Sequence, residues 1–114
     1  MIEDIEQYII EYLDEKLPVP VRTEKPENAP KRYVLIDKTG SGKNNHLPEA
    51  TIAFQSYAES RHEASRLNNT VKKVVEKMEE LGEIRGITLN SDYNFTDTTK
   101  KQYRYQAVYE IRYY

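Results

Sequence analysis

The segment from residue 102 to residue 114 restricts the fold more than any other part of this sequence. Its side chains alternate between two faces, one rich in tyrosine and the other mostly polar. The tyrosine-rich face carries Tyr103, Tyr105, Ala107, Tyr109, Ile111 and Tyr113, and the other face carries Gln102, Arg104, Gln106, Val108, Glu110 and Arg112. A period of two over such a length predicts a long antiparallel strand with its tyrosine-rich face on the core.

Two other segments show the period of an amphipathic helix. The first covers residues 2 to 16 and ends before Pro18, and the second covers about residues 60 to 81. In the first, the apolar residues at spacings of three and four are Ile2, Ile5, Ile9 and Leu13. In the second they are Ala64, Leu67, Val71, Val74, Val75, Met78 and Leu81. Ser60 and Glu63 have the spacing of a capping box, which predicts that the second helix begins there.

Short apolar runs predict the remaining strands. Residues 32 to 38 and 50 to 57 form a hairpin in this interpretation, and residues 84 to 89 form a further strand. Prolines interrupt residues 19 to 24, so this run is at best an edge strand. The resulting order is α-β-β-β-α-β-β. It predicts an α+β fold with two helices packed on one face of a mainly antiparallel sheet, in a single domain spanning residues 1–114.

A glycine-rich segment, Lys38-Thr-Gly-Ser-Gly-Lys-Asn-Asn-His46, follows the first strand of the hairpin and resembles a phosphate-binding loop. Such a loop needs a glycine and a hydroxyl at positions that here hold Asp37 and Asn44. It should also open a helix, whereas the residues that follow alternate like a strand. We therefore interpret the segment as a long, flexible connection with an exposed tip, and we expect no nucleotide and no cofactor there.

The sequence contains no recognisable catalytic or metal-binding constellation. It has no cysteine, and His62 is not followed at helical metal-pair spacing by a second histidine or a carboxylate. His46 precedes Glu49 by three residues, but it lies in a predicted connection rather than a helix. Residues 92 to 97 space oxygen ligands like the start of a calcium loop, but Asp97 and Tyr103 stand where that motif needs glycine and glutamate. No serine, threonine or lysine pairs with a candidate base. We expect a turn-rich loop here, no metal site and no enzymatic activity.

Charge is unevenly distributed along the chain, although the net charge is only −2. The first 16 residues are acidic, with Glu3, Asp4, Glu6, Glu11, Asp14 and Glu15 against Lys16. Residues 100–114 are basic, with Lys100, Lys101, Arg104 and Arg112 against Glu110. The small net charge argues against a dedicated nucleic-acid binder. No apolar run is long enough for a membrane span, so we expect a soluble, cytosolic protein that contacts no membrane and no specific nucleic-acid sequence.

The tyrosine-rich face of residues 102–114 allows two interpretations. Aromatic side chains on a sheet, with lysine and arginine nearby, are typical of single-stranded nucleic-acid binding. In the other interpretation the same side chains form the core under the helices. We favour the core, because Ala107 and Ile111 lie on this face and offer nothing for base stacking.

Segments along the whole chain carry a family resemblance. They are Met1-Ile-Glu-Asp-Ile5, Leu17-Pro-Val-Pro-Val21, Pro30-Lys-Arg-Tyr-Val-Leu-Ile-Asp-Lys-Thr-Gly-Ser-Gly42, Ala50-Thr-Ile-Ala-Phe-Gln-Ser-Tyr-Ala58, Leu89-Asn-Ser-Asp-Tyr-Asn-Phe-Thr-Asp97 and Tyr103-Arg-Tyr-Gln-Ala-Val-Tyr-Glu-Ile111. With these segments the chain resembles the tail terminator proteins of long-tailed (siphovirus-type) bacteriophages, particularly those of Gram-positive hosts. These proteins are also called tail completion or head-tail joining proteins.

The resemblance implies a structural virion protein of a phage or prophage, an α+β subunit that forms a homo-hexameric ring. Such a ring caps the tail tube, stops its polymerisation and joins the tail to the head. The implied partners are copies of the chain itself, the tail tube protein and the head-completion or connector protein. The implied location is the host bacterial cytoplasm during assembly and then the head-tail junction of the virion. The residues expected to reach neighbouring subunits, the tube or the lumen are Gly40, Ser41, Gly42, Lys43, Asn44, Asn45, Asp92, Asn94, Asp97, Lys100 and Lys101.

Two other classes of function stay open from the sequence. The first is a non-viral adaptor or regulatory module that binds proteins. The second, with weaker support, is a single-stranded nucleic-acid-binding module that uses the tyrosine-rich face. The opposite charges of the two chain ends suit the ring, because complementary edges can meet head to tail in a closed interface.

Overall fold

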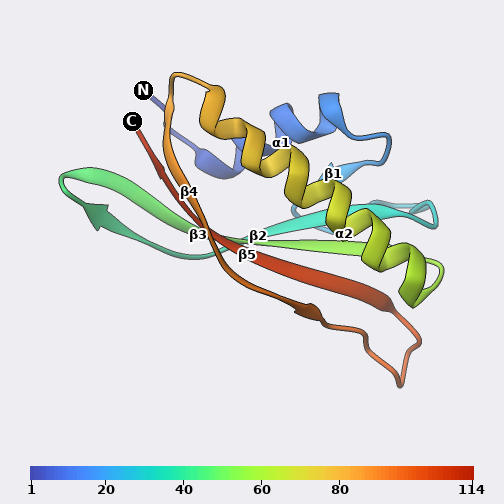
Figure 1. The fold of residues 1–114 in the computed structure, drawn as a ribbon. Coiled ribbons are helices and arrows are strands. Elements are labelled where there is room, and N and C mark those ends of the chain that lie inside the picture. Colours follow the sequence, from blue (N-terminus) through green and yellow to red (C-terminus); the bar gives the residue numbers. More distant parts are fainter.

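A five-stranded sheet carries both helices on one of its faces (Figure 1). The computed structural model describes residues 1–114, apart from the side chain of Asn44. The strands are β1 (Val21–Arg22), β2 (Tyr33–Asn44), β3 (Leu47–Ala58), β4 (Ile84–Asn94) and β5 (Tyr103–Tyr113), in the sheet order β1-β2-β3-β5-β4. Only β1 pairs in parallel, with β2. The predicted α+β fold and element order are confirmed.

The first helix, α1 (Ile5–Lys16), begins later than the predicted residue 2. Asp4 is its N-cap, and the Asp4 carboxylate accepts a hydrogen bond from the backbone N–H of Gln7 at 3.1 Å. The backbone N–H of Ile2 donates to the carbonyl oxygen of Tyr114 at 3.0 Å. The residues before the cap are therefore bound to the end of the last strand, which prevents them from joining the helix.

The second helix, α2 (Arg61–Glu76), begins where the capping signal predicts. The Ser60 hydroxyl accepts a hydrogen bond from the backbone N–H of Glu63 at 3.2 Å. The α-helix is followed directly by the 3-10 helix η1 (Lys77–Glu80). The predicted helix over residues 60–81 is thus confirmed, with its last turn tightened into 3-10 geometry, as is frequent at helix ends.

The core lies between the two helices and the face of the sheet that they cover. Its largest fully buried side chains are Tyr109, Phe54, Ile9, Leu13, Ile36, Ile52, Met78 and Ile111. The centre of the tyrosine-rich face of β5 therefore packs on the helices, which confirms the core interpretation there. Tyr103, Tyr105 and Tyr113, towards the ends of the same face, are partly exposed.

The glycine-rich segment corrects one prediction. Instead of a long flexible loop, it continues β2, which pairs with β3 as far as Asn44 opposite Leu47. Only Asn45 and His46 lie between the strands, with φ of 52° and 68°. Two central residues with positive φ are typical of the type I′ turn, whose twist matches that of an antiparallel pair. The backbone of the segment is therefore held by cross-strand hydrogen bonds.

Strand β4 corrects a second prediction, because it extends past residue 89 to Asn94. Asp92 pairs with Ala107, and Asn94 pairs with Tyr105. The predicted turn-rich loop is shortened to residues 95–102, where an isolated bridge joins Asp97 to Gln102. We call this segment the β4–β5 turn.

Candidate interaction surfaces

The β2–β3 hairpin extends beyond the layer of helices at one end of the molecule (Figure 1). The molecule is elongated, with principal dimensions of 43 × 24 × 22 Å. Ser41, Gly42, Lys43 and Asn45 are exposed on this hairpin and Gly40 is partly exposed, whereas the side chain of Asn44 lies outside the described part of the chain. The candidate residues of the glycine-rich segment are thus grouped on one paired, projecting ribbon.

Asp92 does not lie on a free loop, contrary to our expectation. Its carboxylate accepts a hydrogen bond from the Asn68 amide at 2.8 Å and pairs with the ammonium group of Lys72. Both partners belong to α2, so Asp92 joins β4 to the helix. This contact indicates a structural role for Asp92 rather than an interface role.

The β4–β5 turn is held in one conformation by its own side chains. The Asn94 side-chain oxygen accepts hydrogen bonds from the backbone N–H of Thr96 at 3.1 Å and from its hydroxyl at 2.7 Å. The Asp97 carboxylate accepts from the N–H of Thr99 at 3.0 Å and of Lys100 at 3.2 Å. Asn94 and Asp97 thus act through turn geometry.

Two lysines stand at the tip of this ordered turn. Lys100 and Lys101 are both exposed. Among the described residues, neither forms an ion pair. Lys101 has a φ of 54°, which places it in the left-handed region that tight turns often require. The turn therefore presents two uncompensated positive charges on a rigid support.

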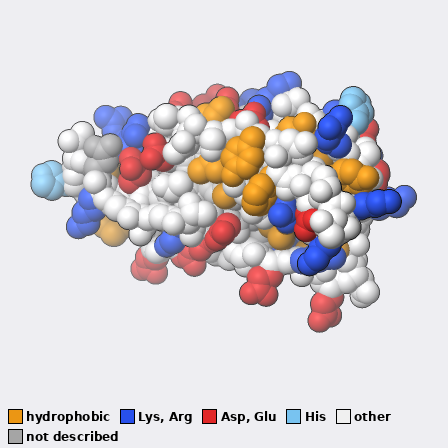
Figure 2. Space-filling view, turned by 90° about the horizontal axis from the view of Figure 1, so that it is seen from below, with side chains coloured by type: hydrophobic (Ala, Val, Ile, Leu, Met, Phe, Trp, Pro, Cys, Tyr) orange, Lys and Arg blue, Asp and Glu red, His pale blue; other side chains and the backbone are white. Residues whose placement is uncertain are grey.

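The sheet face opposite the helices carries an aromatic cluster that the sequence analysis did not identify. Figure 2 shows hydrophobic side chains gathered in the middle of this face and basic side chains towards both of its ends. Tyr33 and Tyr57, which are cross-strand neighbours, stack with ring centroids 4.7 Å apart. The Arg104 guanidinium lies 5.6 Å from the Tyr57 ring and 4.4 Å from the Phe95 ring. Such distances are typical of cation–π contacts.

Polar side chains extend this aromatic cluster across the sheet. The Arg104 guanidinium donates to the Tyr57 hydroxyl at 3.0 Å, and the Gln55 amide donates to the Gln106 amide oxygen at 2.8 Å. Gln106 in turn donates to the hydroxyl of Tyr93. The alternation of β2 and β3 could have indicated this face, because Tyr33 and Tyr57 occupy positions between core residues. Their partnership depends on strand register, which sequence alone does not show.

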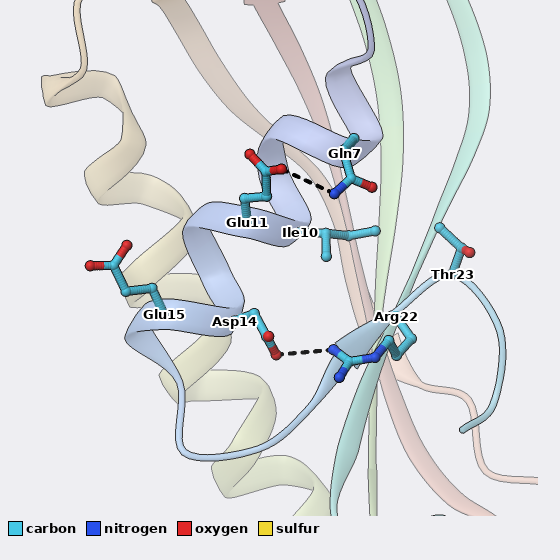
Figure 3. Close-up of a pocket in the computed structure, with 7 residues that line it drawn as sticks. All are labelled: Gln7, Ile10, Glu11, Asp14, Glu15, Arg22 and Thr23. Carbon is cyan, nitrogen blue, oxygen red and sulfur yellow. Dashed lines mark hydrogen bonds and ion pairs between the residues drawn. The ribbon is translucent and has the colours of Figure 1, made fainter. Parts of the chain in front are cut away.

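A groove of about 590 Å³ lies between α1 and β1 (Figure 3). We call it the α1 groove, and its lining residues are Gln7, Ile10, Glu11, Asp14, Glu15, Arg22 and Thr23. Asp14 is neutralised by the Arg22 guanidinium at 3.1 Å and accepts the N–H of Val21 at 3.2 Å. Glu11 accepts a hydrogen bond from the Gln7 amide at 3.2 Å, and Glu15 points away from Arg22, towards the outside of the helix. The groove therefore keeps net negative charge.

The Arg32–Glu59 pair supports a prediction about acid pH. The guanidinium makes two contacts with the carboxylate, at 2.9 and 3.0 Å. The hydrogen bonds from Arg32 lower the pKa of Glu59 from 4.5 to about 2. Because this pKa is depressed in the folded chain, the pair's stabilising contribution is present above about pH 4.5 and is lost as pH falls through about 2.

We expect Arg32→Ala to raise the pKa of Glu59 towards its ordinary value, as measured by an NMR titration of the Glu59 carboxyl carbon. Arg66→Ala is the matched control, since Arg66 contacts Glu63 and not Glu59. It should leave the titration of Glu59 unchanged. A wild-type Glu59 that titrates with a pKa near 4.5 would contradict the assignment.

Metal and membrane features were also considered for the described part of the chain. Within it, no group of three or more histidine, cysteine, aspartate or glutamate side chains could hold a metal ion. His46 is exposed in the hairpin turn, and His62 is exposed in the first turn of α2. None of the described helices combines the length and apolar character needed to cross a bilayer.

Comparisons with known proteins identify no family for this chain. No protein-family model matches it, and no curated protein gives a significant match. Support for a function therefore comes from the fold, from the surfaces described above and from the charges that they carry.

Proposed function

We propose that this chain is the ring-forming subunit of a phage tail terminator. In this proposal six copies close into a ring on the end of the tail tube, stop its growth and present the surface to which the head docks. The partners are then the tail tube protein and the head-completion or connector protein. Assembly takes place in the host cytoplasm, and the ring remains at the head-tail junction of the virion.

The observation that carries the proposal is the position of opposite charges on the sheet. The acidic helix α1 contacts β1 and β2 at one edge, whereas the β4–β5 turn with Lys100 and Lys101 belongs to the opposite edge. Two different, complementary surfaces on opposite sides of a subunit favour head-to-tail association. Such heterologous contacts generate rings when the rotation between subunits closes.

A ring subunit also needs a part that reaches beyond its own body to contact the tube, and the β2–β3 hairpin is such a part. Because the hairpin is paired up to a two-residue turn, it loses little conformational entropy when it binds a partner. We assign the hairpin to contact with the tail tube or the lumen. With the hairpin in this role, the two edges of the sheet are available for neighbouring subunits.

Electron microscopy of the purified protein, with and without tail tubes, tests the proposed function. We expect rings, and we expect tubes assembled with the protein to carry a ring at one end and to stop growing. A matched variant that lacks the tip of the hairpin has residues 43–48 replaced by a two-residue Asn-Gly turn between the paired residues Gly42 and Glu49. It should still form rings but cap tubes poorly. Tubes that keep elongating in the presence of the wild-type protein would contradict the proposal.

Self-association should weaken as salt increases, because the two complementary surfaces are exposed to solvent. At about 0.15 M salt the screening length is about 8 Å, and higher salt shortens it further. We expect sedimentation velocity to show a shift from ring to smaller species between low and high salt. An unchanged species distribution over this range would mean that the charged surfaces do not form the interface.

One observation favours the alternative of a non-viral adaptor. Tyr93 and Phe95 are the exposed members of the aromatic cluster on the open sheet face, and aromatic side chains are enriched in protein interfaces. An adaptor would bind its partner through this face as a monomer or small oligomer. The same microscopy distinguishes the two, since an adaptor neither forms rings nor caps tubes.

A further inference from the structure

We infer that the β4–β5 turn of one copy docks into the α1 groove of the next copy, where Lys100 and Lys101 meet the carboxylates of Glu11 and Glu15. The inference rests on the proposed function, and it names the surfaces through which the ring subunits would bind each other. It commits to one occupant of the groove, a second copy of this chain.

The groove has two features that fit this occupant. Ile10 supplies apolar surface, and Figure 3 shows it pointing from α1 into the space beside β1. Glu11 and Glu15 are one helical turn apart, so their side chains lie on the same side of α1. Neither forms an ion pair with a described residue, in contrast to Asp14, which Arg22 neutralises. Glu11 and the outward-pointing Glu15 therefore offer two unneutralised carboxylates along the outer side of α1, at the margin of the groove.

The β4–β5 turn fits the groove in two ways: its charge is opposite, and its conformation is already fixed before it binds. It offers two adjacent ammonium groups against two carboxylates. The hydrogen bonds of Asp97 and the bridge to Gln102 hold the turn before it binds. A preformed turn avoids much of the entropy cost that a flexible loop incurs on binding.

The sheet order places the two surfaces where a ring needs them. The α1 groove lies at the β1 edge, and β4 is the opposite edge strand. Each copy can then use its groove for one neighbour and its turn for the other. A contact of this kind leaves the β2–β3 hairpin and the open sheet face free for other partners.

Crosslinking tests the contact directly, because the chain has no natural cysteine. The variant Glu15→Cys with Lys100→Cys carries one thiol on each proposed surface. With a short bismaleimide we expect a ladder of covalent oligomers that ends at the closed ring. Each single variant should give no species above the dimer. The matched control, Glu15→Cys with Lys73→Cys, has its second thiol on the exposed face of α2 and should give no ladder.

Charge reversal provides a second, independent measurement. We expect Lys100→Glu with Lys101→Glu to raise the dissociation constant of self-association by at least about tenfold, since like charges would face each other. Glu11→Lys with Glu15→Lys should have the same effect, and mixing the two variants should restore association. Lys73→Glu with Lys77→Glu changes the net charge equally on α2 and η1 and is the control. Circular dichroism checks that the three variants are folded like wild type.

The outcomes separate this inference from the proposed function. If rings form in wild type and in the Lys100→Glu, Lys101→Glu variant alike, and the ladder is missing, the docking inference is wrong while the ring proposal stands. If wild type neither associates nor caps tubes, both are wrong. If the lysine reversal leaves association unchanged but weakens binding of a labelled oligo-dT, measured by fluorescence anisotropy, the turn contacts nucleic acid and the inference is overturned.

Discussion

Replacing Tyr109 by alanine should lower the free energy of unfolding by about 3–5 kcal/mol, the usual cost of deleting a buried aromatic side chain. Tyr109 is fully buried, and its ring packs edge to face with Phe54 at 5.8 Å. The substitution would leave a cavity between β5 and the helices, which the rigid sheet cannot close. Thermal and denaturant unfolding measure the effect. Tyr114→Ala is the matched control, because Tyr114 is 46% exposed and its loss should cost less than about 1 kcal/mol.

Tyr109→Phe separates the ring from the hydroxyl. The hydroxyl donates a hydrogen bond to the Glu76 carboxylate at 2.6 Å, and its loss should cost about 1.5–3 kcal/mol, the range for a hydrogen bond to a charged group. Burial, with a further contribution from Glu76, raises the pKa of Tyr109 well above its ordinary value of 10. A raised pKa contributes stability that is present below pH 10 and is lost at higher pH, when the unfolded chain ionises. The phenylalanine variant should therefore lose less stability than wild type above pH 10.

An alanine variant that unfolds like wild type would contradict the placement of Tyr109 in the core. It would equally contradict the orientation of the sheet, since β5 is its second strand from one edge and pairs on both sides. Such a result would mean that the tyrosine-rich face of β5 is exposed to solvent, where its rings could stack on bases.

Leu13→Ala should have the second large effect, about 2–5 kcal/mol of lost stability. Leu13 is fully buried on the inner side of α1 and belongs to the same core cluster as Leu17 and Val21. Its truncation removes part of the contact that holds α1 on the sheet. Leu89→Ala deletes the same atoms at a site that is 43% exposed and should cost less than about 1 kcal/mol.

The Leu13 variant also reports on the α1 groove. If α1 is loosened, hydrogen exchange of its amide protons should accelerate more than that of α2. The α1 groove would lose its shape together with the helix, so self-association should weaken as well. Equal exchange rates in α1 of wild type and variant would mean that Leu13 does not anchor the helix.

The sequence correctly predicted those elements whose signals are local. The spacing of apolar residues on α2 and the capping pair Ser60 and Glu63 lie within a few residues of one another, so they can be recognised without knowledge of the fold. The alternation in β5 is equally local, and it indicated which side faces the core. From the helix and strand order, the α+β architecture followed.

Other features depended on pairing between distant segments. Glycine, asparagine and serine in residues 40–45 favour turns by composition, yet β3 pairs with this segment and holds it as a strand. In the same way, pairing with β5 extends β4 to Asn94 and directs Asp92 to Lys72 on α2. Amino-acid composition indicates the conformation that an isolated segment favours. Hydrogen bonds to a neighbouring strand can outweigh that preference in the folded chain.

The candidate surfaces show the same division between sequence and tertiary structure. By itself, the sequence determined that one end of the chain is acidic, that the other is basic, and that the core face of β5 is apolar at its centre. Only the tertiary structure decided that α1 and the β4–β5 turn lie at opposite edges of the sheet, and that Tyr57, Phe95 and Arg104 meet on its open face. The physical reason is that charge and periodicity belong to each segment alone, whereas strand order and register arise from contacts between segments far apart in the chain.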